Sequence, residues 1–128
     1  MNFEERIAAA RTRTFKAVFP GDSNHYDTLF GGVALQWMDE CAFIAATRFA
    51  RAKVVTVTSD RVTFKTPIPA GSLVELDAQI SKVGSSSIEV KVNVYKEAMY
   101  SFDRELALSG TFVMVAIGDD RKPVKLER

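Results

Sequence analysis

The segment from Asn24 to Glu40 holds the residue types best able to do chemistry in this chain. Two glycines open an apolar stretch, and an acidic pair begins seven residues after the second glycine. Bare glycines at a helix start let a ligand approach the unpaired N–H groups of the first turn, which can polarise a carbonyl and stabilise an oxyanion. The plainer interpretation of Gly31 and Gly32 is close backbone packing. We expect the backbone donors and a carboxylate to belong to one rigid element.

Asp39 is the carboxylate with the more unusual surroundings. Aspartate is a poor helix-interior residue, and an unpaired carboxylate among apolar neighbours is costly unless it is partnered or used. At about 100° per residue, Asp39 lies on the side of Gly32 and Phe43, whereas Glu40 falls in a polar stripe with Gln36. A solvated or ion-paired position is therefore favoured for Glu40. For Asp39, a place in the polar stripe and a functional role remain open.

Other catalytic chemistries have little support in the sequence. One histidine and one cysteine cannot make a zinc-ligand cluster, so no metal site is expected. Cys41 stands in mid-helix without the electropositive setting that makes a thiolate, which favours buried packing, and His25 is expected to be an exposed loop residue. No G-x-S-x-G elbow, P-loop or G-x-G-x-x-G fingerprint is present. What remains indicates attack by water on an activated carbonyl, such as a thioester.

Composition indicates one ordinary globular domain spanning residues 1–128. The chain is 47% hydrophobic and 26% charged, and its 17 basic and 16 acidic residues are scattered. That balance argues against nucleic acid and against a polybasic membrane patch as partners. The lone cysteine, the acidic start of the chain and the lack of an apolar run of about 20 residues predict a cytoplasmic protein that does not span a membrane.

The pattern of apolar residues predicts one long helix and an antiparallel sheet, an α+β class. The expected elements are a short helix from Phe3 to Ala10, a strand from Thr12 to Phe19, a helix from Gly31 to Ala50, strands from Val54 to Phe64, Val74 to Ser81 and Ile88 to Tyr95, a loop from Lys96 to Leu106, and a strand from Phe112 to Ile117 that is covered on both faces. The strand beginning at Val74 is expected to be half exposed and to form a hairpin with the strand that follows it.

The long helix is apolar around almost its whole circumference. One sheet of about five strands cannot cover all of that surface. A second copy of the chain, joined sheet edge to sheet edge with the two helices side by side, is the simplest cover. The sequence therefore predicts a homodimer.

An ordered set of segments carries a resemblance to a known family. The set comprises Phe19 to Asn24, Thr28 to Gly32, Trp37 to Glu40, Val54 to Thr56, Pro67 to Gly71 and Lys82 to Ser87. From about Thr12 to Pro123, the chain resembles the hotdog-fold acyl-CoA thioesterases, and within them the YciA-like and cytosolic acyl-CoA hydrolase group. The resemblance implies a helix wrapped by a curved sheet, dimers joined edge to edge, and trimers of dimers. It also implies hydrolysis of acyl-CoA, with coenzyme A as part of the substrate and no separate cofactor.

The resemblance assigns roles to the residues of the opening segment. Asp39 would be the catalytic carboxylate that activates water or attacks the thioester. Asn24 and Thr28 would face Asp39 of the other subunit, and the backbone N–H of Gly31 or Gly32 would polarise the carbonyl. Relatives often carry aspartate or asparagine where this chain has Thr28.

The resemblance also implies where coenzyme A lies. The pantetheine arm would contact Thr56, Thr58 and Ser59, and the nucleotide would contact the turn that contains Lys82, Gly84, Ser85 and Ser86. Close relatives tend to have arginine where Ser85 stands, so that one phosphate contact is lost or is supplied by Lys82, Arg121 or Lys122.

Two other functions on the same fold remain as alternatives. One is a non-catalytic module that binds acyl-CoA or lipid. The other is a hotdog dehydratase or hydratase that uses His25 with an acid.

Overall fold

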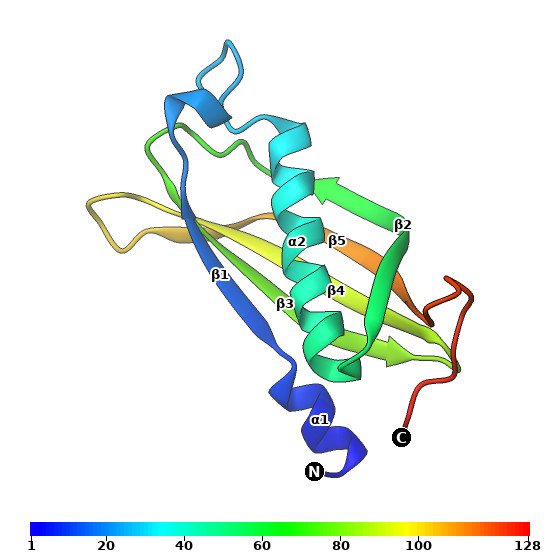
Figure 1. Cartoon of the computed structure of the whole chain (residues 1–128). Helices are drawn as coiled ribbons and strands as arrows, with labels where there is room; N and C mark the ends of the chain where they lie inside the picture. The colour runs from blue at the N-terminus through cyan, green and yellow to red at the C-terminus, as the bar shows by residue number, and fades with distance from the viewer.

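The computed structural model describes residues 1–128 as two α-helices, a short 3-10 turn and five strands (Figure 1). In chain order these are α1 (Phe3–Ala9), β1 (Thr12–Ala17), η1 (Pro20–Asp22), α2 (Gly31–Ala50), β2 (Lys53–Phe64), β3 (Leu73–Val83), β4 (Ser87–Glu97) and β5 (Arg104–Ile117). The strands form one antiparallel sheet in the order β1-β3-β4-β5-β2, so β1 and β2 are its two edges. Neither helix is both long enough and apolar enough to cross a membrane.

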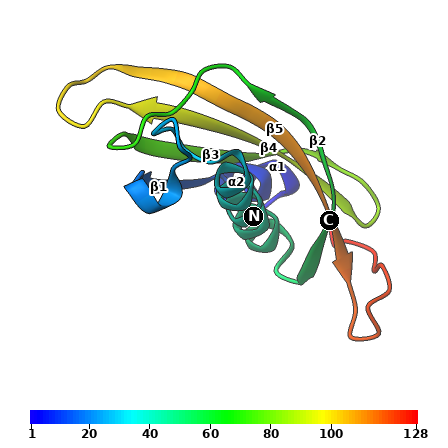
Figure 2. The same ribbon diagram turned by 90° about the horizontal axis from the view of Figure 1, so that it is seen from above.

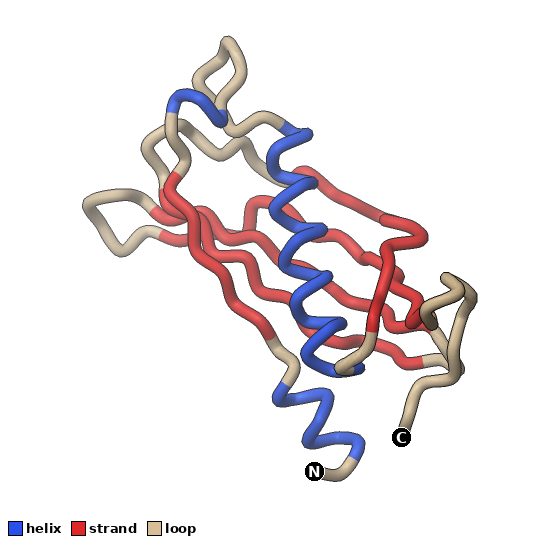
Figure 3. The backbone as a smooth tube through the Cα atoms, viewed as in Figure 1, coloured by secondary structure: helices blue, strands red, loops and turns tan.

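The sheet curves around α2, which lies along its concave face (Figures 1 and 2). Figure 3 shows the strands crossing behind the helix from one edge to the other. Four of the buried residues of α2 are alanines, which let the helix approach the sheet closely. Met38 on the helix and Val92 and Met114 on the sheet are all 0% exposed and belong to one core. The predicted α+β architecture is confirmed.

Helix α2 begins and ends at the predicted residues, Gly31 and Ala50. It ends because Arg51 takes a left-handed conformation, with φ 51°, and its N–H bonds to the carbonyl of Thr47. The side of the helix that faces away from the sheet keeps apolar residues at the surface: Leu35 is 36% exposed, Phe43 45% and Ile44 40%. This chain's own sheet therefore leaves part of the helix uncovered.

The predicted hairpin between β3 and β4 is confirmed, but its outer face differs from expectation. Leu76 pairs with Val94 on the helix side, as the alternating pattern predicts. The outward Glu75 and Asp77, expected to be exposed, are only 8% and 5% exposed. Arginine side chains cover them: Arg104 Nη2 lies 2.9 Å from Glu75 Oε2, and Arg11 Nη2 lies 2.6 Å from Asp77 Oδ2.

The predicted loop from Lys96 to Leu106 is wrong at both ends. Strand β4 runs on to Glu97 and β5 starts at Arg104, because the polar side chains there satisfy one another on the sheet surface. The guanidinium of Arg104 lies 3.9 Å from the ring centre of Tyr95, and Lys96 Nζ lies 3.0 Å from Glu105 Oε1. Strand β1 ends at Ala17 and not at the predicted Phe19. Strand β5 was predicted to be covered on both faces, but its outward side chains are only partly buried.

Candidate active site

Asp39 lies half-buried on α2 and is held by a residue of the edge strand β2. The hydroxyl of Thr56 donates a hydrogen bond of 2.8 Å to Asp39 Oδ1. The same hydroxyl oxygen lies 3.0 Å from the sulfur of Met114, which pairs with Thr56 across the sheet. A hydroxyl has one proton, and a carboxylate is a far stronger acceptor than a thioether. The bond to Asp39 therefore prevails and fixes one carboxylate oxygen.

The first turn of α2 presents free backbone donors. Its N-cap residue is Phe30, whose side chain makes no capping bond, and the first intrahelical bond runs from the N–H of Ala34 to the carbonyl of Phe30. The N–H groups of Gly31, Gly32 and Val33 have no acceptor within the chain. A Cβ added at Gly32 would meet nothing within 4 Å. These donors, at the positive end of the helix dipole, can therefore bind an anion or a polarised carbonyl.

The loop before the helix holds Asn24 in one orientation. Asn24 Oδ1 accepts bonds from the N–H of Tyr26 at 2.9 Å, the N–H of Thr28 at 3.2 Å and the hydroxyl of Thr28 at 3.1 Å. Three donors around one oxygen settle which end of the amide is the carbonyl. The NH2 group of Asn24 is left without an acceptor in the chain, so it is free to donate. Thr28 therefore positions Asn24.

A cleft of about 380 Å3 lies at this end of the helix. It is lined by Asn24, Thr28, Leu29, Gly31, Phe64, Lys65, Thr66 and Pro67. Asp39 is not part of it, because Asp39 follows Gly31 by eight residues, which is about 12 Å along a helix axis. Within one chain, the amide donors and the carboxylate therefore lie at separate places. Phe64 and Lys65 are lining residues that sequence reasoning missed, and no local pattern indicated them.

The residues predicted to contact coenzyme A lie along β2 and at the far end of the sheet. A register shift between Thr56 and Thr58 places Thr58 opposite Val113, on the outer face, and Ser59 opposite the buried Phe112, on the helix side. Sequence reasoning gave Thr56 to the pantetheine arm and missed its bond to Asp39, because the register of β2 cannot be taken from the sequence.

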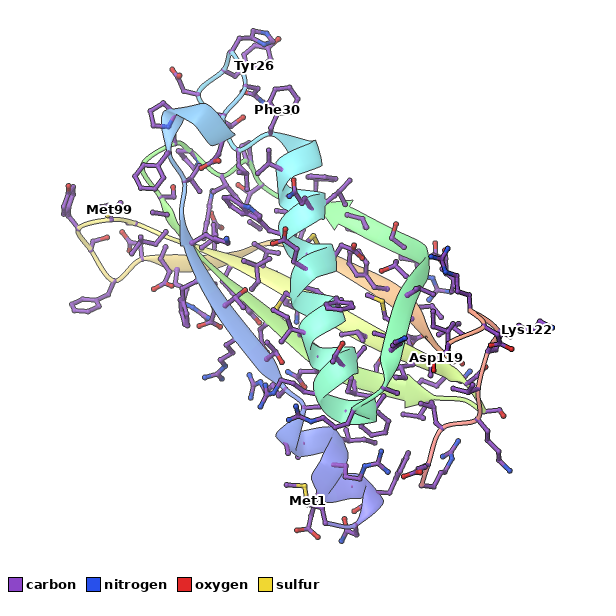
Figure 4. All side chains as sticks on the ribbon, viewed as in Figure 1. Met1, Tyr26, Phe30, Met99, Asp119 and Lys122 are labelled. Carbon is purple, nitrogen blue, oxygen red and sulfur yellow. The ribbon has the colours of Figure 1, made fainter.

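The predicted nucleotide contacts cluster around the turn between β3 and β4. Lys82 lies one residue before the end of β3, on the outer face, opposite Glu89. The C-terminal segment binds the turn: the N–H of Leu126 bonds to the carbonyl of Ser85, and Arg128 donates to the carbonyl of Gly84 at 3.0 Å. Arg121 is exposed in the turn after β5. Its sequence neighbours Asp119 and Lys122 lie at one side of the molecule, away from Tyr26 and Phe30 (Figure 4). Ser86 completes this group through its carbonyl, which accepts from Ala116.

Three residues considered for other roles have structural explanations. Cys41 is buried, and burial raises the pKa of its thiol, so it is no nucleophile. His25 is exposed and its ring lies 3.9 Å from that of Tyr26. Glu40 is exposed and accepts a bond of 3.2 Å from Gln36. No group of three or more histidine, cysteine or acidic residues could hold a metal ion.

Comparison with known proteins gives consistent matches. The sequence profile of the thioesterase superfamily matches residues 26–101. YkhA of Bacillus subtilis, named an uncharacterized acyl-CoA thioester hydrolase, is 40% identical over 111 residues, which cover 87% of this chain and 64% of that protein. The acyl-CoA thioester hydrolase YciA of Salmonella typhimurium is 33% identical over 107 residues, covering 81% of this chain and 80% of that protein. This chain thus spans less than two thirds of the length of YkhA.

Among solved structures, an acyl-CoA hydrolase from Staphylococcus aureus is similar in both fold and sequence. Its complex with butyryl-CoA, coenzyme A and coenzyme A disulfide superposes with a TM-score of 0.89 at 34% identity, covering 94% of this chain and 73% of that one. Solved forms of the same hydrolase carry single replacements by alanine of an aspartate, an asparagine or a threonine. In sequence, that asparagine precedes the aspartate by 15 residues and the threonine follows it by 17.

Proposed function

This chain belongs to the thioesterase superfamily, and we propose that it hydrolyses acyl-CoA thioesters to a free acid and coenzyme A. The observation that carries the proposal is the pairing of two complementary features on one rigid helix. One is a first turn whose amide donors are free, and the other is a carboxylate fixed by a threonine hydroxyl. The proposal needs no metal and no cofactor, since coenzyme A is part of the substrate.

The free donors would bind the thioester carbonyl. The N–H groups of Gly31 and Gly32 and the NH2 group of Asn24 have no acceptor in the chain, and Asn24 and Gly31 line the same cleft at the start of α2. Donors held in place before the reaction stabilise the negative charge that develops on the carbonyl oxygen. A loop locked by three bonds to Asn24 Oδ1 keeps that donor from reorienting during the reaction.

Asp39 would supply the base or the nucleophile. As a base, its carboxylate takes a proton from water while the water oxygen bonds to the carbonyl carbon. The tetrahedral intermediate then collapses, the C–S bond breaks, and the thiolate of coenzyme A takes the proton from Asp39. As a nucleophile, Asp39 itself would displace the thiolate, and water would hydrolyse the resulting anhydride. In both routes the bond from Thr56 holds Oδ1, and Oδ2 would be the oxygen that reacts.

The complete site would be built by two subunits. The free edge strand β2 carries Val55 and Val57, 42% and 56% exposed, and α2 leaves Leu35 and Phe43 uncovered. A second copy added along β2 would cover both surfaces and bring the helices together. Asp39 of the partner subunit would then face the donors at the start of the first helix. We extend the dimer to a hexamer, a trimer of dimers, on the resemblance alone.

The Staphylococcus aureus variants support these assignments. The separations of 15 and 17 residues between the replaced asparagine, aspartate and threonine equal those between Asn24, Asp39 and Thr56. The three residues replaced in the Staphylococcus aureus hydrolase thus have the same types and the same spacing as Asn24, Asp39 and Thr56. Thr56 joins the site as the residue that positions the carboxylate.

Coenzyme A would run from the carboxylate along β2 to the turn between β3 and β4. Thr58 and Ser59 would lie beside the pantetheine arm. The phosphates would bind at Lys82 and the nearby turn, and Arg121 would supply a further cation where relatives tend to have an arginine in place of Ser85. We also place the reaction in the cytoplasm, because the single cysteine is a buried free thiol.

Complementation between two inactive variants tests the proposal. Asp39→Asn and Asn24→Ala are each expected to abolish thiol release from acyl-CoA while sedimentation shows unchanged assembly. Mixed after unfolding and refolding together, they should recover about a quarter of the wild-type activity, because half of randomly formed dimers are mixed and each of those holds one intact site of two. Full activity of either variant alone would refute the role of that residue. Two inactive variants without recovery on mixing would refute the shared site.

A further inference from the structure

The cleft at the start of α2 contains a cation that the proposed hydrolysis does not use. Lys65 lines the cleft together with Phe64, Asn24 and Gly31, and its ammonium makes no ion pair or side-chain hydrogen bond in the chain. The nearby Lys96 differs, because its ammonium contacts Glu105, the hydroxyl of Thr66 and the carbonyl of Pro67. Of these two lysines, only Lys65 has an ammonium without a partner in the chain.

We propose that this cleft is the acyl subsite and that Phe64 and Lys65 select short acyl groups that end in a carboxylate. The favoured substrates would be CoA thioesters of short dicarboxylic acids. The inference rests on the proposed function, since it takes the free donors at the helix start as the place where the thioester carbonyl binds.

The direction of the substrate leads to this cleft. The acyl substituent and the sulfur leave the carbonyl carbon on opposite sides. If the sulfur lies toward Asp39 of the partner subunit and its pantetheine arm follows the partner's β2, the acyl group extends the other way. Asn24 and Gly31 both hold donors for the carbonyl and line the cleft, so the cleft begins where the carbonyl ends.

The size and walls of the cleft fit a short chain. Its volume of about 380 Å3 is near the lower end of ligand pockets, which span about 300–1,000 Å3. Leu29, Phe64 and Pro67 supply apolar surface for a few methylene groups. The ring of Phe64 lies beside the start of the helix, where a Cβ added at Gly31 would be 3.7 Å from it.

The charge of the cleft fits an acyl group that ends in an anion. No aspartate or glutamate is among its lining residues, and the positive end of the α2 dipole adds to the charge of Lys65. The backbone of Lys65 is held by a bond of 2.8 Å from its N–H to the carbonyl of Ala107, which fixes where its side chain starts. A carboxylate at the end of a short acyl group would meet this cation, whereas a methyl end would leave it unpaired.

The test compares two thioesters of equal chain length, glutaryl-CoA and pentanoyl-CoA, by thiol release from the assembled protein. The wild type is expected to prefer glutaryl-CoA, and Lys65→Met, which keeps the side-chain stem, should lower the ratio of the two kcat/KM values about fivefold, as a partly exposed ion pair allows. Lys91→Met, which removes an exposed cation from the outer face of β4, should keep the wild-type ratio.

Two results would overturn the inference while leaving the hydrolysis intact. One is a wild type that turns over both thioesters without preferring glutaryl-CoA. The other is a Lys65→Met variant that loses activity equally on both, which would mean that Lys65 acts on coenzyme A or on the fold. A wild type that hydrolyses neither thioester, nor any other acyl-CoA, would refute the proposed function and the inference with it.

Discussion

Replacing Thr56 by valine tests whether the threonine positions the catalytic carboxylate. Valine keeps the shape and the strand preference of threonine but removes the hydroxyl that donates a hydrogen bond of 2.8 Å to Asp39 Oδ1. A hydrogen bond to a charged group contributes about 1.5–3 kcal/mol. Because Thr56 is exposed and Asp39 only half-buried, water replaces part of that bond, and the low end of the range applies. A loss of about 1.5 kcal/mol in the transition state lowers kcat/KM about tenfold.

The stability of the fold should hardly change. The position is exposed, so the free energy of unfolding in urea is expected to stay within about 0.5 kcal/mol of the wild type. Thr56→Ser, which restores a hydroxyl at the same place, should recover most of the activity. Thr63→Val removes a hydroxyl from another exposed position of β2, where the only bond is a long one of 3.4 Å to the carbonyl of Arg61, and it serves as the matched control.

The assay is thiol release from a short acyl-CoA over a range of substrate concentrations, with the unfolding curve of each variant measured alongside. A tenfold loss in Thr56→Val that Thr56→Ser reverses is the expected pattern. Wild-type activity in Thr56→Val would refute the reasoning. An equal loss in Thr63→Val would also refute it, since the effect would then belong to the strand and not to the bond with Asp39.

Two further predictions concern the fold and its assembly. Arg11 donates two hydrogen bonds to Asp77 and so holds the pKa of that carboxyl below its usual range. The ion pair therefore stabilises the protein above about pH 4, the pKa of an unfolded aspartate. This stabilisation is lost as pH falls through the lowered pKa of Asp77 in the folded protein. Asp77→Asn should lower the free energy of unfolding by about 1–2 kcal/mol at neutral pH, less than the loss of a fully buried pair, because Arg11 is 43% exposed. Between about pH 4 and pH 2, the urea midpoint of the variant should fall less steeply than that of the wild type. Parallel curves for the two proteins would contradict the role of the pair. Phe43→Glu places a charge on the uncovered side of α2. Sedimentation should then show single chains, and thiol release should vanish while unfolding stays cooperative. An intact dimer would contradict the proposed interface.

The long helix and the central hairpin could be predicted from the sequence because local pattern alone decides them. Residues 33–50 are mostly apolar and follow two glycines, and Leu76 to Ile80 and Val90 to Val94 alternate in step, so each element carries its own signal. The outer face of β3 could not be predicted in this way. Glu75 and Asp77 look like solvent-facing residues until Arg104 and Arg11, which are distant in sequence, cover them. Local periodicity contains no information about such remote partners.

The candidate site also contains residues that local pattern predicts and residues that it does not. Asp39 and the glycine pair stand out locally, since an aspartate in an apolar helix and two glycines at its start are unusual by residue type. The bond from Thr56 to Asp39 depends instead on the register of β2, which shifts between Thr56 and Thr58. One residue of slip would turn Thr56 to the outer face and bring a valine to Asp39. The same dependence on register hid Phe64 and Lys65, which the end of β2 brings to the start of the helix.

The rigidity of α2 explains why the proposed site needs two chains. The amide donors and Asp39 lie about 12 Å apart on one straight helix, and no side-chain movement brings them within reach of a single carbonyl. A flexible loop could fold back and close that distance, but a helix packed against five strands cannot. Two such helices, set side by side in opposite directions, bring the start of each beside the middle of the other and so create two sites at once. Assembly would then be the step that completes the catalytic geometry, and a separated chain would keep its fold while losing its activity.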